Sequence, residues 1–209
     1  MNIIMVTGII IYSLFLAYTA YLIIRSLIDK LYCDAILSMG VAVLSTQIFI
    51  VANYAGQFLR LGMDRVLNVG LQSVGMLLIL ACLVLLCYAF LSKRKVSNLI
   101  SAWGSTRLFL TQGIYGIIRH PIHLSGVLAS LGIAFLVANA VVIALGIIAS
   151  FAFILASKEE DRYSQKAIGT EYSTYMKTVP AFNFILGLRN KLAGGFLQRD
   201  AIRDIKTKQ

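Results

Sequence analysis

Two histidines, an arginine and a proline stand together at the start of a long apolar stretch, in TQGIYGIIRHPIHLSG (111–126). Proline is accepted in the first turn of a helix, so Pro121 predicts a helix start with His120 at the N-cap and His123 in the first turn. The open N–H groups of such a turn favour a bound anion, for example a carboxylate, and either imidazole could add a hydrogen bond. The alternative is that Arg119 and the histidines only anchor a membrane span at the lipid headgroups.

A second group of polar residues follows the same apolar stretch, in SKEEDRY (157–163). Glu159 and Glu160 are adjacent, so on a helix their side chains point about 100° apart and cannot both face one pocket squarely. Either carboxylate could hold the hydroxyls of a ribose or balance a positively charged ligand. The alternative is a solvated helix end in which Glu159 pairs with Arg162 or Tyr163.

A third segment, GTEYSTYMKTVPAF (169–182), places Tyr172 and Tyr175 three residues apart and ends its element at Pro180. Aromatic residues near a membrane surface usually form an interfacial belt. The same two rings could instead form the wall of a pocket.

The composition places these three segments in a membrane protein. Of 209 residues 59% are hydrophobic and only 13% are charged, whereas charged residues make up about a quarter of a soluble domain. The net charge of +10 suits basic loops that face anionic lipid, and no aromatic and basic platform for nucleic acid is visible. Three cysteines give no disulfide framework and no metal-binding spacing, so we expect no metal.

Four apolar blocks predict the spans: Ile3–Ile24, Ala35 to about Leu59, Val66–Leu91 and Ile122–Ser157. The first block lacks a basic start and a cleavage site, so it reads as a retained span. The last block is too long for one crossing and carries Asn139 in its middle, which predicts a tight hairpin of two helices of about 17 residues each. The expected fold is an all-α polytopic membrane protein with about five transmembrane helices.

Basic residues predict the orientation of these spans. They concentrate between the third and fourth spans and after the fifth, which places the C-terminus in the cytoplasm and the N-terminus outside. We expect three consecutive segments: a membrane scaffold of three helices (1–95), a catalytic cofactor-binding region with the hairpin (96–188) and a cytoplasmic basic tail (189–209). Short loops without retention signals favour a prokaryotic plasma membrane.

The order of the three polar segments resembles that of the integral-membrane methyltransferases, which include isoprenylcysteine carboxyl methyltransferases and phospholipid N-methyltransferases. Their pattern is G-x-Y-x-x-x-R-H-P-x-Y-x-G, a hairpin, E-E, and F-G-x-E-Y-x-x-Y-x-x-x-V-P. Here it reads GIYGIIRHPIHLSG, KEED and IGTEYSTYMKTVP, within roughly a third of the chain. The family tyrosine after R-H-P is His123 here. The family arginine that faces a substrate carboxylate falls on Ala156, which weakens the prenylcysteine interpretation in particular.

This resemblance implies an enzyme that binds S-adenosylmethionine and methylates a lipid or lipid-like acceptor from the bilayer. The residues it assigns to the cofactor are Leu110, Tyr115, Arg119, His120, Pro121, Glu159 and Glu160. Candidate catalytic residues are Glu160, Glu159 and His123, since a protonated amine acceptor would need a base. Two other interpretations stay open: a sterol-reductase-like oxidoreductase that uses NADPH, and a non-enzymatic lipid-binding membrane subunit. The acceptor and the oligomeric state are not specified by the sequence.

Overall fold

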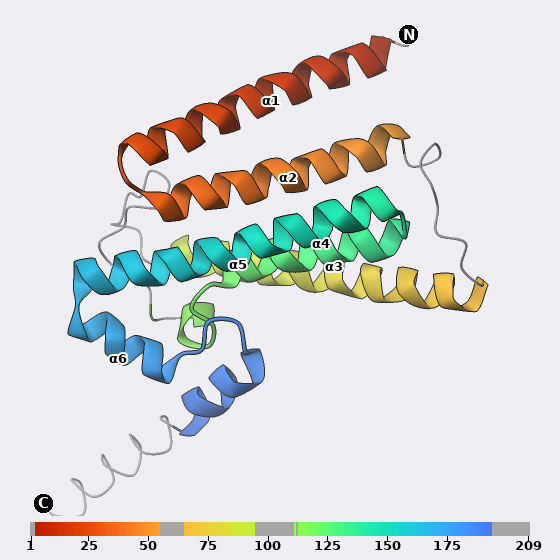
Figure 1. The fold of residues 1–209 in the computed structure, drawn as a ribbon. Coiled ribbons are helices and arrows are strands. Elements are labelled where there is room, and N and C mark those ends of the chain that lie inside the picture. Colours follow the sequence, from red (N-terminus) through yellow and green to blue (C-terminus); the bar gives the residue numbers. More distant parts are fainter. Residues whose placement is uncertain (1–2, 55–64, 95–110, 112, 194–209) are drawn as a thin grey trace, which may run out of the picture. The chain divides into compact units, whose positions relative to one another are not determined.

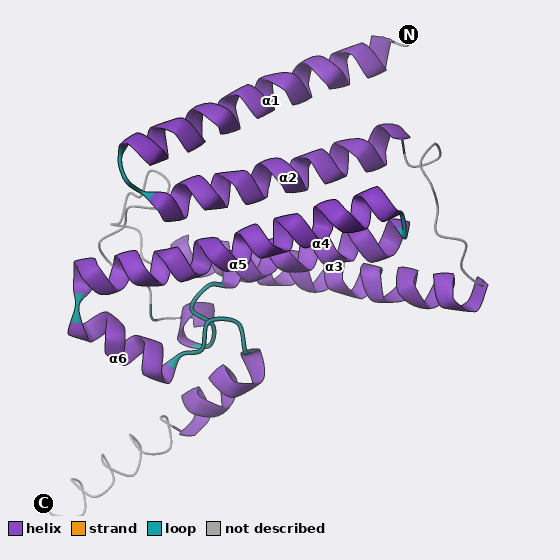
Figure 2. Ribbon diagram, viewed as in Figure 1, coloured by secondary structure: helices purple, strands orange, loops and turns teal. Residues whose placement is uncertain are grey.

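The computed structural model of the chain describes residues 3–54, 65–94, 111 and 113–193. The described residues are helical and contain no strand (Figure 2). The elements are α1 (Ile3–Ile28), α2 (Tyr32–Tyr54), α3 (Arg65–Arg94), the short 3-10 helix η1 (Gly113–Gly116), α4 (Pro121–Val137), α5 (Ala140–Ile168) and α6 (Thr170–Thr178) (Figure 1). A further helix covers 184–193.

The membrane character of the fold is confirmed. Four of these helices, α1, α2, α3 and α5, are long and apolar enough to cross a bilayer, and α4 is a shorter apolar helix. Their lipid-compatible sequences leave many large apolar side chains exposed, such as Leu14, Leu83 and Phe151. Lipid is the solvent that makes this exposure favourable. The chain is therefore an all-α polytopic membrane protein.

The chain divides into two compact units, and each unit is built from two separate stretches of sequence. Unit 1 comprises Met1–Leu86 and Ile122–Tyr163, and unit 2 comprises Cys87–Pro121 and Ser164–Gln209. The units therefore interleave along the chain and cross the boundaries of the three consecutive segments expected from the sequence.

Within unit 1, α1 packs along α2 (Figure 1). The Tyr12 ring stacks on Phe49 with centroids 4.2 Å apart, and its hydroxyl shares a hydrogen bond of 2.5 Å with Thr46. Hydrocarbon offers the two hydroxyls no hydrogen-bond partner, so they bond to each other between the helices.

Small residues bring the other helices of unit 1 close together. A Cβ on Gly75 of α3 would lie 2.7 Å from the carbonyl of Gly132 in α4, and a Cβ on Gly146 of α5 would lie 2.8 Å from the carbonyl of Ser130. Such close backbone approach is typical of helix packing in membranes, where small side chains gain dispersion contacts.

A buried glutamine joins three helices at the centre of unit 1. Gln47 of α2 is fully buried, and its Nε2 donates to the carbonyls of Ser130 in α4 and Val142 in α5, both at 3.0 Å. The Ser130 and Ser150 hydroxyls lie 3.1 Å apart beside it. Polar side chains in a span turn toward protein rather than lipid, so this cluster fixes α2 against the hairpin.

The predicted hairpin is confirmed, with one correction. The turn lies at Ala138 and Asn139, and the Asn139 side chain accepts from the backbone N–H groups of Val141 and Val142, which caps α5. The first helix, α4, has 17 residues as expected, but α5 has 29 and is not short. It continues through SKEEDRYSQKAI, whose Lys, Glu, Arg, Gln and Ala residues are good helix formers. It ends before Gly169, whose φ of 79° is left-handed.

Candidate functional site

The hairpin brings two predicted site residues together in unit 1. His123 lies in the first turn of α4 and Glu160 lies far along α5, and the His123 Nε2 is 3.6 Å from Glu160 Oε2. The His123 side chain is 8% exposed and that of Glu160 is 42% exposed. A buried imidazole thus meets a carboxylate that a ligand can reach, at one end of the helix bundle.

Glu159 points elsewhere. It accepts a hydrogen bond from the guanidinium of Arg162, one turn further along α5. This pairing with Arg162 is the alternative to a ligand-binding role for Glu159, and the two adjacent carboxylates diverge as expected. Of the two, Glu160 is the carboxylate directed at His123.

Two residues that the sequence did not single out lie at the same end of unit 1. Asp34, in the first turn of α2, and the buried Cys33 both interact electrostatically with Glu160. The Cys33 thiol lies 3.7 Å from Asp34 Oδ1. Asp34 is the acidic residue of α2, at the mouth of a span, which is the signal that could have identified it. Asp34 and Glu160 thus place two carboxyl groups at this end of unit 1.

The other predicted residues lie in unit 2, where the R-H-P segment meets the segment after α6. The backbone N–H groups of Arg119 and His120 donate to the carbonyls of Pro180 and Ala181, at 3.0 and 3.3 Å. His120 is buried, with its ring 6.3 Å from that of Phe182. The helix α4 begins at Pro121, as predicted, so His120 directly precedes it.

Arg119 also holds the end of α6. One of its terminal nitrogens donates to the carbonyls of Met176 and Val179, at 2.9 and 2.6 Å. The last carbonyls of a helix have no partner within the helix, so a guanidinium is a suitable donor there. Arg119 therefore has a structural role in unit 2, whatever else its guanidinium contacts.

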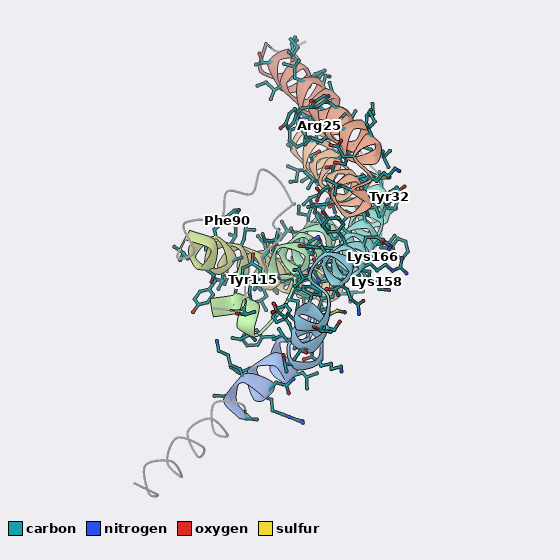
Figure 3. All side chains as sticks on the ribbon, turned by 90° about the vertical axis from the view of Figure 1, so that its left-hand side faces the viewer. Arg25, Tyr32, Phe90, Tyr115, Lys158 and Lys166 are labelled. Carbon is teal, nitrogen blue, oxygen red and sulfur yellow. The ribbon has the colours of Figure 1, made fainter. Side chains whose placement is uncertain are left out.

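A group of tyrosines forms the interior of unit 2. Tyr172 and Tyr175 of α6 are buried with their rings 5.7 Å apart, and they pack with Val179. The Tyr175 hydroxyl donates to the carbonyl of Tyr115 at 2.6 Å. Tyr115 lies on η1 (Figure 3) and is buried as well. The Y-x-x-Y segment thus lies inside the protein and not in an interfacial belt.

Leu110 lies outside the described residues. The other predicted residues belong to two units: His123, Glu159 and Glu160 to unit 1, and Tyr115, Arg119, His120 and Pro121 to unit 2. His123 and Glu160 also carry donor atoms of the kind that bind divalent metals.

No family model, curated protein or solved structure matches the chain. The chemistry of the site therefore rests on the geometry of its own residues and on the resemblance of its motifs.

Proposed function

We propose that the protein is an S-adenosylmethionine-dependent methyltransferase that acts on a lipid or lipid-like acceptor in the bilayer. The observation that carries the proposal is the contact of His123 with Glu160 across the hairpin. The motif resemblance requires the start of α4 and the end of α5 to meet, and two residues far apart in sequence meet there.

The charges at this end of unit 1 fit the proposed cofactor. Asp34 and Glu160 bring two carboxyl groups to this end, and an ionised carboxylate favours a cation such as a sulfonium. The exposed part of the Glu160 carboxylate can accept hydrogen bonds from ribose hydroxyls, which are charge-assisted and therefore strong.

S-adenosylmethionine supplies a methyl group that is already activated, so the protein needs only to position the acceptor, exclude water and accept a proton. For an amine acceptor, Glu160 is the base, because its carboxylate is reachable from solvent and is held by His123 on one side. The apolar helices of unit 1 suit an acceptor that arrives from the bilayer. The position of the family arginine is occupied by Ala156, which is fully buried.

Calorimetric titration of the purified protein in detergent tests the proposal. We expect micromolar binding of S-adenosylhomocysteine and none of NADPH. Glu160→Gln should weaken binding by about one to two orders of magnitude, because hydrogen bonds to a charged group contribute about 1.5–3 kcal/mol. Asp29→Asn is the matched control, since Asp29 is half-exposed and pairs with Arg25.

Three outcomes would contradict the proposal. Binding of NADPH alone would support the reductase-like alternative. A folded protein that binds neither compound would support a lipid-binding subunit. Equal affinity for S-adenosylhomocysteine in Glu160→Gln and Asp29→Asn would remove Glu160 from the site.

A further inference from the structure

The helix at 184–193, the blue helix that follows α6 in Figure 1, exposes an apolar face. At 100° per residue, Phe184, Ile185, Leu188 and Leu192 fall on one side of this helix. All four are exposed, Ile185 at 81% and Leu192 at 58%. We call these four residues the apolar face of the helix. Exposure of these apolar side chains to water would cost free energy.

Three other residues of the same helix hold it to the rest of unit 2. Gly187 is buried against the carbonyl of Ile117, which leaves no room for a side chain. The Asn190 amide donates to the carbonyl of Thr178 at 2.9 Å, and the Lys191 ammonium donates to that of Gly113 at 3.3 Å. The apolar face is therefore a surface of an anchored helix, and not one side of a loose end.

The stretch of sequence that contains this helix carries only positive charges. The sequence from Tyr172 to Arg199 contains no aspartate or glutamate, and Lys177, Arg189 and Lys191 lie within it. A short helix with an apolar face and basic residues beside it is the pattern of helices that lie in the surface of an anionic bilayer.

We propose that the helix at 184–193 lies in the lipid–water interface, with its apolar face among the acyl chains of an anionic bilayer. A bilayer is favoured over a protein partner because four helices of the same chain are candidate spans and basic residues complement anionic headgroups. Since the helix is anchored to Gly113 and Ile117, its docking holds the stretch that leads to Arg119 and His120 at the depth of the headgroups.

Quenching of tryptophan fluorescence by lipids with brominated acyl chains tests this proposal in the full chain. The single tryptophan, Trp103, is first replaced by phenylalanine. Ile185→Trp and Leu192→Trp are then compared in phosphatidylglycerol vesicles with and without bromine. Leu83→Trp on the exposed side of α3 gives the signal of a lipid-facing residue, and Thr174→Trp, at an exposed and uncharged position of α6, is the control.

We expect Ile185→Trp and Leu192→Trp to lose most of their emission in brominated lipid, as Leu83→Trp does, while Thr174→Trp keeps most of its own. Two independent positions guard against a variant that does not fold. Quenching of both no stronger than that of Thr174→Trp would overturn the proposal. Emission that shifts to the blue only as protein concentration rises would assign the face to a second copy instead. Equal quenching in phosphatidylcholine would remove the requirement for anionic lipid.

Discussion

Replacement of Gly126 by alanine is expected to disturb the packing of α4 on α5 beside the His123–Glu160 pair. Gly126 lies one turn beyond His123, and a Cβ there would be 2.7 Å from three atoms of the Phe153 ring. Phe153 is buried, and its ring also lies 3.4 Å from the place that a Cβ on Gly40 would occupy. The ring is held between two glycines and has little room to move aside.

The size of the effect follows from two opposing terms. Overpacking a well-packed interior costs about 1–3 kcal/mol. Alanine in place of glycine within a helix gains about 1 kcal/mol. Gly126→Ala should therefore lower the free energy of unfolding by up to about 2 kcal/mol. Gly70→Ala in α3 is the matched control, because a Cβ there meets nothing within 4 Å and only the favourable term applies.

The assay is unfolding by dodecyl sulfate in mixed micelles, followed by circular dichroism, for both variants. We expect Gly126→Ala to be less stable than Gly70→Ala by about 1–3 kcal/mol. Adding Phe153→Leu to Gly126→Ala should restore part of the loss, because residues in contact are coupled. Equal stability of the two glycine variants, or no rescue by the second substitution, would refute the proposed packing.

Three further substitutions test individual contacts. Asn139→Ala removes the cap of α5 and should lower the free energy of unfolding by about 1 kcal/mol in the same assay. Asn139→Asp keeps a capping oxygen and should be more stable than Asn139→Ala. An equal loss of stability in both variants would contradict the cap. Tyr175→Phe removes the hydrogen bond to the Tyr115 carbonyl and should cost about 1 kcal/mol. The amide hydrogens of α6 should then exchange faster with solvent. Arg119→Lys loses the planar guanidinium that reaches two carbonyls, so α6 should also exchange faster; an unchanged rate would show that Arg119 does not hold α6.

The spans were predictable because hydropathy and length are local properties of a sequence. Ile3–Ile24 was extended by only four residues in α1, which ends at Ile28, and Val66–Leu91 differs from α3 by one residue at its start and three at its end. The turn at Asn139 was predictable because the apolar block Ile122–Ser157 is too long for one membrane crossing. Each of these needed no knowledge of which helices pack together.

The length of α5 was not predictable from hydropathy, since that quantity marks only the part of a helix that lies in lipid. The helix continues to Ile168 on polar residues, supported by the Glu159–Arg162 pair. The divergence of Glu159 and Glu160 was predictable from the helical repeat alone. Their partners depended on the position of α4.

Long-range packing decided the rest of the site. Gln47 was visible in the sequence as a polar residue in a span, but its donation to Ser130 and Val142 depends on how three helices meet. The same holds for Asp34, which lies near Glu160 because α2 begins where α5 leaves the bundle. A sequence motif marks residues that are close along the chain or share a pattern, and neither property applies to Asp34.

The pairing of Arg119 and His120 with Pro180 and Ala181 has a consequence for the order in which the protein is made. A ribosome adds about 5–20 residues per second, so these two amides wait several seconds for their partner carbonyls. Until then the two N–H groups must donate to water. The segment around Arg119 and His120 therefore stays out of hydrocarbon until translation has passed Ala181. A nascent chain that stalls just before Pro180 would already contain the four candidate spans α1, α2, α3 and α5. Its R-H-P segment would stay unfolded, and cellular proteases could recognise the chain by that segment.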